Sequence, residues 1–184
     1  MKRIFLTLAS LATIFLIATI VMGLNVGDAK SLDQATQSRI SSHMLVGLGA
    51  LTFVTLVHAI TLTYFMGTGR WIEETSQAYS LGDAFHSQNQ KLKYSTLPGM
   101  TLCMGLLITT GALGAIADPA SPMSLDGTLG MTGAQIHFLV AVITAIANLA
   151  TNFTQFVGIS RNTAVVDSVL DEVRRIREER GLSV

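Results

Sequence analysis

Charge is scarce in this 184-residue chain: Asp, Glu, Lys and Arg together make up 13% of it, and their formal net charge is zero. A chain without an excess of positive charge has no electrostatic means of attracting nucleic acid, so we expect no nucleic-acid partner. Cysteine is scarcer still. Cys103 is the only one, which supports neither a disulfide framework nor a cysteine-based zinc site.

Apolar residues dominate instead, with a hydrophobic content of 49% and a mean hydropathy of +0.51. A membrane-spanning helix needs roughly 20 mainly apolar residues. Four windows meet this requirement, at about 4–24, 40–68, 95–117 and 131–159. We therefore expect an all-α integral membrane protein, a four-transmembrane-helix up-down bundle in which the whole chain forms one domain.

The first window has an alternative interpretation, because Lys2 and Arg3 precede it and a cleaved signal peptide also begins with basic residues. However, the apolar centre of a signal peptide is typically only about 7–15 residues long. This window is longer, and no clear small-x-small cleavage site follows it. A retained first helix is the preferred interpretation.

Basic residues are distributed unevenly between the windows. The N-terminus, the segment after the second window and the C-terminal tail carry ten Lys and Arg residues, whereas the two opposite connections carry only Lys30 and Arg39. An excess of Lys and Arg marks cytoplasmic segments. We expect both termini in the cytoplasm and the chain in the inner membrane of a bacterium-like cell.

Residues 69–94 are too polar to insert and are predicted to form a cytoplasmic helical hairpin. Within them, Ser80-Leu81-Gly82-Asp83 has the Ser-x-x-acid form of a helix N-terminal cap, which predicts that the third helix begins near Gly82. A kink is expected near Pro98.

Residues 160–181 are predicted to form a cytoplasmic amphipathic helix whose apolar side covers the hairpin. Apolar residues recur there at spacings of three or four, with charged residues between them. They are Val166, Val169, Val173 and Ile176.

Ionisable groups inside membrane spans are rare and are functional candidates by default. Here they are histidines. His43 lies a turn inside the outer end of the second window, His58 follows fifteen residues later, and His137 lies near the outer end of the fourth. At about 100° per residue, His43 and His58 lie on one side of their helix.

The fourth window also carries a polar stripe on the helix face of His137. Lipid cannot satisfy polar side chains, so the stripe must face the interior of the bundle. Hydrogen bonding between helices is a sufficient explanation for its residues. They are Thr144, Asn148, Thr151, Asn152 and Gln155.

The second and fourth helices run in the same direction, so His43 and His137 are expected at a similar depth on diagonal neighbours of the bundle. In this respect the chain resembles the four-helix core of b-type membrane cytochromes, where histidines of these two helices bind haem iron from opposite sides and glycines lie against the porphyrin. The resemblance implies one haem b near the outer face, with His43 and His137 as iron ligands and Gly47 and His58 as further cofactor-binding residues.

The chain departs from that family on the inner side, where the expected ligand near Thr151 or Asn152 is not a histidine. A second haem there would need an unusual partner for His58. Residues of the third window at about the right depth are Met100, Cys103 and Met104.

A haem with two histidine ligands is coordinatively full, which suits electron transfer rather than oxygen chemistry. The resemblance thus implies an electron carrier or cytochrome-like subunit, with a quinone as a further possible cofactor, rather than a stand-alone enzyme with catalytic residues. The alternative is a non-catalytic subunit or scaffold of a larger assembly, whose polar stripe serves helix packing. The expected partners are the lipid bilayer and either other membrane subunits or a second copy of the chain.

Other metal sites and transport have less support. His86 lies near Glu73 and Glu74 in the predicted hairpin, but a helical stalk separates it from His58, and no spacing resembles that of zinc proteases or di-iron proteins. No charged residue interrupts a span, which argues against an independent transporter.

Overall fold

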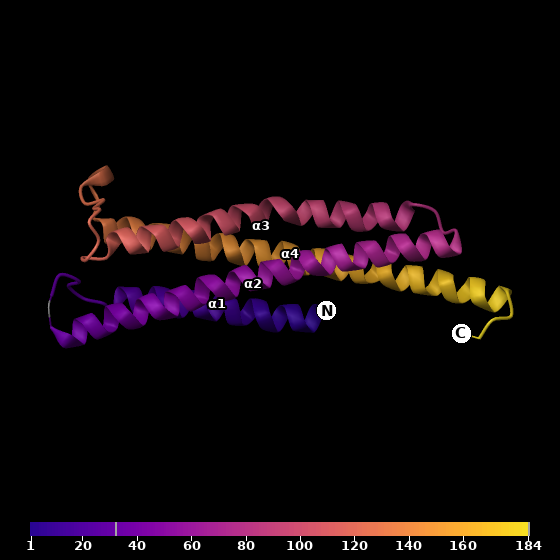
Figure 1. Cartoon of the computed structure of the whole chain (residues 1–184), viewed down its shortest axis with the longest axis horizontal. Coiled ribbons are helices and arrows are strands. Elements are labelled where there is room, and N and C mark those ends of the chain that lie inside the picture. The colour runs from indigo at the N-terminus through magenta and orange to yellow at the C-terminus, as the bar shows by residue number, and fades with distance from the viewer. Residues whose placement is uncertain (32, 184) are drawn as a thin grey trace.

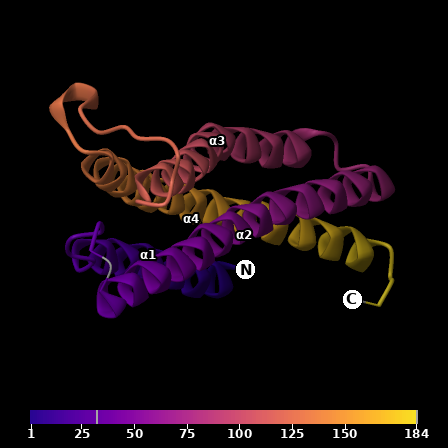
Figure 2. The same ribbon diagram turned by 60° about the vertical axis from the view of Figure 1, so that its left-hand side comes forward.

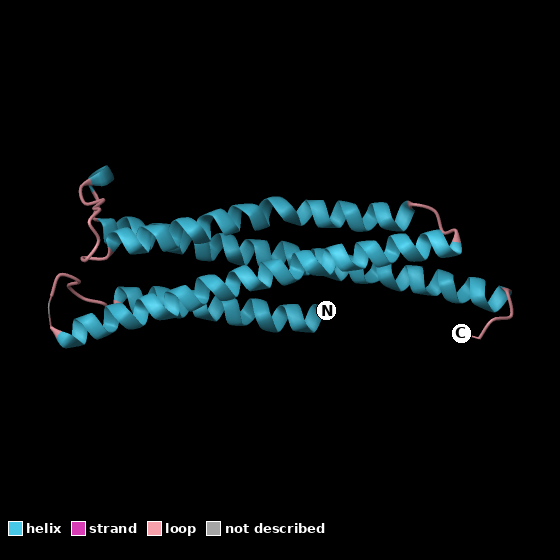
Figure 3. Ribbon diagram, viewed as in Figure 1, coloured by secondary structure: helices cyan, strands magenta, loops and turns pink. Residues whose placement is uncertain are grey.

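The computed structural model describes residues 1–31 and 33–183. The chain is 84% helical, and no strand occurs in this described part. Figures 1 and 3 show long helices that lie side by side, joined by loops. Each of the four α-helices is long and apolar enough to cross a membrane. The elements are α1 (Lys2–Leu24), α2 (Gln34–Tyr79), α3 (Ala84–Ala117), the short 3₁₀ helix η1 (Thr128–Gly130) and α4 (Gly133–Glu179).

The bundle has two distinct ends. The connection after α1 and the longer connection after α3 lie together at one end, which we call the connector end (Figure 1). The turn between α2 and α3 and the C-terminus lie at the other, which we call the hairpin end. Helix α2 contacts α4 across the bundle as well as its neighbours α1 and α3, and α1 contacts α4. In cross-section, α2 and α4 therefore lie on one diagonal of the bundle, and α1 and α3 lie on the other.

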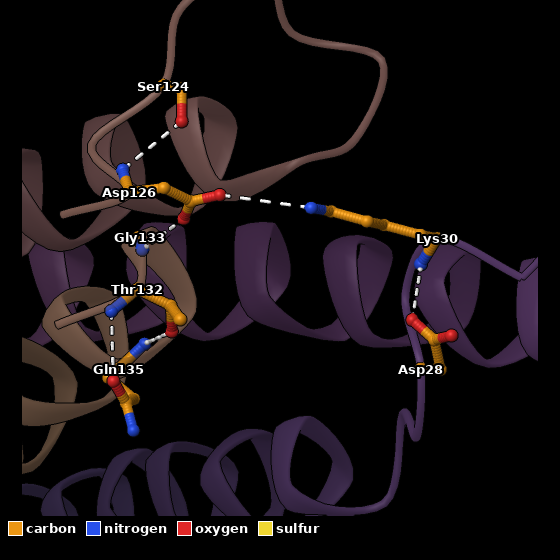
Figure 4. Close-up of polar contacts among 7 residues, drawn as sticks. All are labelled: Asp28, Lys30, Ser124, Asp126, Thr132, Gly133 and Gln135. Carbon is orange, nitrogen blue, oxygen red and sulfur yellow. Dashed lines mark hydrogen bonds and ion pairs between the residues drawn. The ribbon is translucent and has the colours of Figure 1, made fainter.

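Side-chain caps fix where two of the helices begin. The Asp33 carboxylate accepts a hydrogen bond from the backbone N–H of Thr36 at 2.9 Å, which starts α2. Thr132 and Gln135 form a reciprocal capping box at the start of α4 (Figure 4). Such caps satisfy backbone donors that have no partner within the helix.

The expected cap at Ser80 is wrong. Ser80 has a left-handed conformation with φ of 58° and ends α2, while α3 begins at Ala84 with Asp83 as its first flanking residue. The turn between these helices is so short that Ser80 serves as the C-terminal cap of the preceding helix. Asp83 makes no side-chain capping hydrogen bond.

Helix α3 continues through Pro98, which removes one backbone donor from its interior. The helix bends along its length, as Figure 2 shows. Helix α4 is also continuous, so residues 160–179 extend the fourth apolar window without a break. At the hairpin end its Val165 and Val169 are buried in one apolar cluster with Ile72 of α2.

Candidate functional site

Two histidine rings meet edge to face inside the connector half of the bundle. His43 of α2 and His137 of α4 have ring centroids 6.2 Å apart and ring planes inclined by 78°. Both side chains are half-buried. The structure thus brings together, across the diagonal of the bundle, two residues that lie far apart in the sequence. We call them the histidine pair.

Helix α1 holds the ring of His43 in place. The Nδ1 atom of His43 lies 3.1 Å from the backbone carbonyl oxygen of Thr19. Because a carbonyl can only accept, Nδ1 carries the proton and Nε2 keeps its lone pair for another partner. Gly23, one turn further along α1, lets the ring approach: a Cβ atom there would lie 3.1 Å from the His43 ring.

Helix α3 packs against the ring of His137. A Cβ atom on Gly114 would lie 3.0 Å from this ring, so a side chain at that position would push it away. The backbone of Thr110 lies near the ring. Nδ1 of His137 is buried without a hydrogen bond of ordinary geometry, which distinguishes it from Nδ1 of His43.

In both halves of the chain a glycine of the neighbouring helix lies against the histidine ring. In each half, a Thr-x-x-x-Gly segment of the first helix lies against a histidine of the second helix. The residues that follow the two histidines are also similar: His43-Met44-Leu45-Val46 and His137-Phe138-Leu139-Val140. The sequence-based reasoning missed these four positioning residues, which are Thr19, Gly23, Thr110 and Gly114. The Thr-x-x-x-Gly pattern also occurs at 63–67, 101–105 and 154–158, so the pattern alone does not mark them.

The separation of the rings fits a single metal ion between them. An imidazole nitrogen lies about 2 Å from an ion that it binds, so two rings that share one ion have centres roughly 6 Å apart. No cluster of three or more His, Cys, Asp and Glu residues occurs in the described chain, so the protein supplies two such ligands at most. Structural zinc takes four protein ligands, whereas haem iron takes four from its porphyrin. The donor set therefore fits haem better than zinc.

Charged groups lie at the connector end, beyond the histidine pair. Lys30 and Asp126 form an exposed ion pair of 3.9 Å between the two connections, and Asp126 also accepts from the backbone N–H of Gly133 at 2.9 Å (Figure 4). The hydroxyl of Ser31 and the side chain and backbone N–H of Thr36 donate hydrogen bonds to Asp33, and they hold the pKa of its carboxyl well below the usual range.

Gly47, the other residue expected to contact a cofactor, faces α1. A Cβ atom at this position would lie 3.3 Å from Cγ2 of Thr19. It therefore lets α2 approach α1 beside the carbonyl group that holds His43. This contact concerns helix packing.

His58 lies apart from the histidine pair, since fifteen residues of α helix span about 22 Å. It is 1% exposed, and its Nδ1 lies 3.0–3.2 Å from the amide atoms of Gln155. Cys103 contacts Asn148 at 3.8 Å through its thiol. The polar stripe of α4 thus reaches both α2 and α3.

His86 is distant from the other histidines in function as well as in sequence. Its Nδ1 lies 3.2 Å from the carbonyl oxygen of Gly69, and its Nε2 lies 3.0 Å from the amide nitrogen of Gln90. Both ring nitrogens thus have protein partners within the hairpin. His86 is not part of the candidate site.

Comparison of the chain with models of protein families, with curated proteins and with solved structures finds no match. The geometry of the histidine pair therefore carries the functional argument.

Proposed function

We propose that the chain is an integral membrane electron-transfer protein, or a cytochrome-like subunit of a larger complex, that holds one haem b between His43 and His137. The observation that carries the proposal is the pair of adjacent histidine rings, whose centroids lie 6.2 Å apart on two helices. Their position in an apolar bundle supports it further, because an imidazole without a polar partner is costly at membrane depth.

A haem held by His43 and His137 would supply a one-electron redox couple, and two histidine ligands would leave no position open for oxygen chemistry. The residues of the chain position these ligands. The Thr19 carbonyl keeps the proton on Nδ1 of His43, which leaves Nε2 available, and Gly23 and Gly114 let the two rings approach their neighbouring helices. Such hydrogen bonds behind a ligand fix its tautomer and orientation.

We further propose that the helices form an up-down bundle in the inner membrane of a bacterium-like cell, with both termini in the cytoplasm. The support is the excess of Lys and Arg at the hairpin end and in the tails. The histidine pair would then lie near the outer face. A quinone or another membrane subunit is the proposed electron partner, and a second copy of the chain is an alternative.

A second candidate function is that of a non-catalytic subunit or scaffold. Hydrogen bonds between helices favour it: Thr110 and Thr144 share one of 2.7 Å, and Asn89 donates one of 2.8 Å to Asn162. In that case the histidine pair is an edge-to-face contact, since such rings also have centroids about 4.5–7 Å apart.

The test is an absorption spectrum of the detergent-purified protein from haem-replete cells. We expect a Soret band that shifts on reduction, with a stoichiometry near one haem per chain, and its loss in His43→Ala and in His137→Ala. His86→Ala is the matched control, because this histidine has protein partners on both ring nitrogens. Colourless wild-type protein, or a band that survives in both variants, would contradict the proposal and favour the scaffold function.

A further inference from the structure

A second group of polar side chains lies buried at the middle of the bundle. We call it the inner polar cluster and define it as His58 of α2, Cys103 of α3, and Asn148, Asn152 and Gln155 of α4. Their exposed fractions are 1%, 0%, 1%, 6% and 0%. The three α4 residues share one face of the helix, since they are three or four residues apart.

Hydrogen bonds within the inner polar cluster satisfy only some of its atoms. His58 pairs with Gln155 through Nδ1, and Cys103 pairs with Asn148 through Oδ1. Four polar atoms have no hydrogen bond of ordinary geometry: Nε2 of His58, Nδ2 of Asn148, and both Nδ2 and Oδ1 of Asn152. The Asn148 side chain lies near the His58 ring.

The same bundle satisfies another buried amide of α4. Asn162, further along α4 and 0% exposed, accepts from Asn89 at 2.8 Å and donates to Thr68 at 2.9 Å. Of the four buried amide atoms in the described chain that have no hydrogen-bond partner, three belong to the inner polar cluster, and the fourth is Oε1 of Gln90 on α3. Because each unpaired polar group is costly away from water, and most of all inside a membrane, these atoms point to a bound partner.

The chemistry of the four atoms limits what that partner is. The amide nitrogens donate, Oδ1 of Asn152 accepts, and Nε2 of His58 does either. A metal ion does not match amide N–H donors, and an anion does not match a carbonyl oxygen in a cluster without a cation. Near-complete burial excludes a lipid-sized molecule such as a quinol. Water is small, donates and accepts, and typically makes about three hydrogen bonds when buried.

We infer that the inner polar cluster is a binding site for ordered water, with Nε2 of His58 and the amide groups of Asn148 and Asn152 as its protein ligands. The site is distinct from the histidine pair and does not depend on haem. Water at this site would hydrate the His58 imidazole inside the apolar bundle. A hydrated imidazole exchanges protons with water, whereas one without bound water does not.

The direct test is water-edited NMR on bilayer-reconstituted protein with ¹⁵N-labelled asparagine. We expect magnetisation transfer from water to the side-chain amides of Asn148 and Asn152 to be several-fold faster than to those of Asn89 and Asn162. These two paired amides are the control within the same sample. Transfer to Asn148 and Asn152 that is no faster than transfer to the paired amides would overturn the inference.

A variant separates bound water from a merely unpaired amide. In Asn152→Leu, we expect faster water transfer to Asn148 to disappear and the midpoint of thermal unfolding to fall by roughly 2–4 °C. If the cluster were dry, removal of two unpaired atoms would instead raise the midpoint. A raised midpoint, or water transfer to Asn148 that is unchanged in the variant, would contradict water binding at this residue.

Discussion

The histidine pair and the inner polar cluster occupy corresponding places on the same two helices. On α2, His43 is followed fifteen residues later by His58, and on α4, His137 is followed fifteen residues later by Asn152. Near the connector end, two half-buried rings meet edge to face. At the middle of the bundle, one imidazole and three amide side chains lie together almost fully buried.

The difference lies in which groups hold the imidazoles. The Thr19 carbonyl group and Gly23 of α1 hold the His43 ring. Its Nδ1 is used in this contact and its Nε2 is left free. A side chain of the core, Gln155, holds His58 instead. A carbonyl group thus fixes Nδ1 of His43, whereas a buried amide fixes Nδ1 of His58.

The largest expected effect is a loss of stability at one site and of cofactor binding at the other. We expect His58→Leu to lower the free energy of unfolding by about 1–3 kcal/mol, because it leaves the buried Gln155 unpaired, and to leave the absorption spectrum unchanged. His43→Leu should abolish the spectrum and change the stability of the haem-free protein less. Unfolding titrations and spectra of both variants check this.

The double variant His58→Leu/Gln155→Leu provides the control. Replacement of both partners of a buried hydrogen bond by apolar side chains is close to neutral. We therefore expect it to recover most of the stability lost in His58→Leu. A double variant no more stable than the single one would mean that His58 and Gln155 do not act as a pair.

The periodicity of the sequence predicted the parts of this architecture that depend on a single helix. The four helical windows and the alignment of Thr144, Asn148 and Gln155 on one face follow from the helical repeat alone. All three of these side chains are buried in the structure. The similar level of His43 and His137 was predicted from the direction of their helices and their positions in them. Helix direction requires only the number of spans.

Other features depend on contacts between helices, which one sequence does not specify. Nothing in the local sequence of Gly23 or Gly114 marks either as the neighbour of a histidine. The pattern that begins at Ser80 fits both the start of one helix and the end of another, and the length of the turn decides between them. Which amides remain unpaired depends on the positions of single atoms across the bundle.

A second effect, of similar size, tests the glycine contacts of the histidine pair. We expect Gly23→Ala and Gly114→Ala each to displace a ring, since the new Cβ atom would lie 3.1 or 3.0 Å from it. Overpacking of this kind typically costs about 1–3 kcal/mol. Shifts of similar size in the Soret band and in haem retention, measured on the two purified variants, would show that the two halves act alike.

Gly49→Ala and Gly105→Ala are the matched controls on α2 and α3. A Cβ atom at either position meets nothing within 4 Å. Because alanine is favoured over glycine inside a helix by roughly 0.5–1 kcal/mol, these variants should be as stable as the wild type or more so. If the controls lose as much haem as Gly23→Ala and Gly114→Ala, the contact with the rings is not the cause.

The smallest expected effect concerns Asp33, which caps α2 ten residues before His43 and far from the inner polar cluster. Asp33→Ala should lower the unfolding midpoint by roughly 2–4 °C at neutral pH, because the Thr36 N–H loses its acceptor.

The folded protein lowers the pKa of this carboxyl, chiefly through the hydrogen bond from Ser31. The stabilisation is therefore complete above the usual aspartate range and is lost as the pH falls below it, through the lowered pKa. Asp33→Asn keeps a capping oxygen and should show no such pH dependence, so unfolding midpoints of the three proteins between neutral and acidic pH separate the cap from the charge. If acid lowers the midpoints of wild type and Asp33→Asn equally, other carboxyl groups account for the loss.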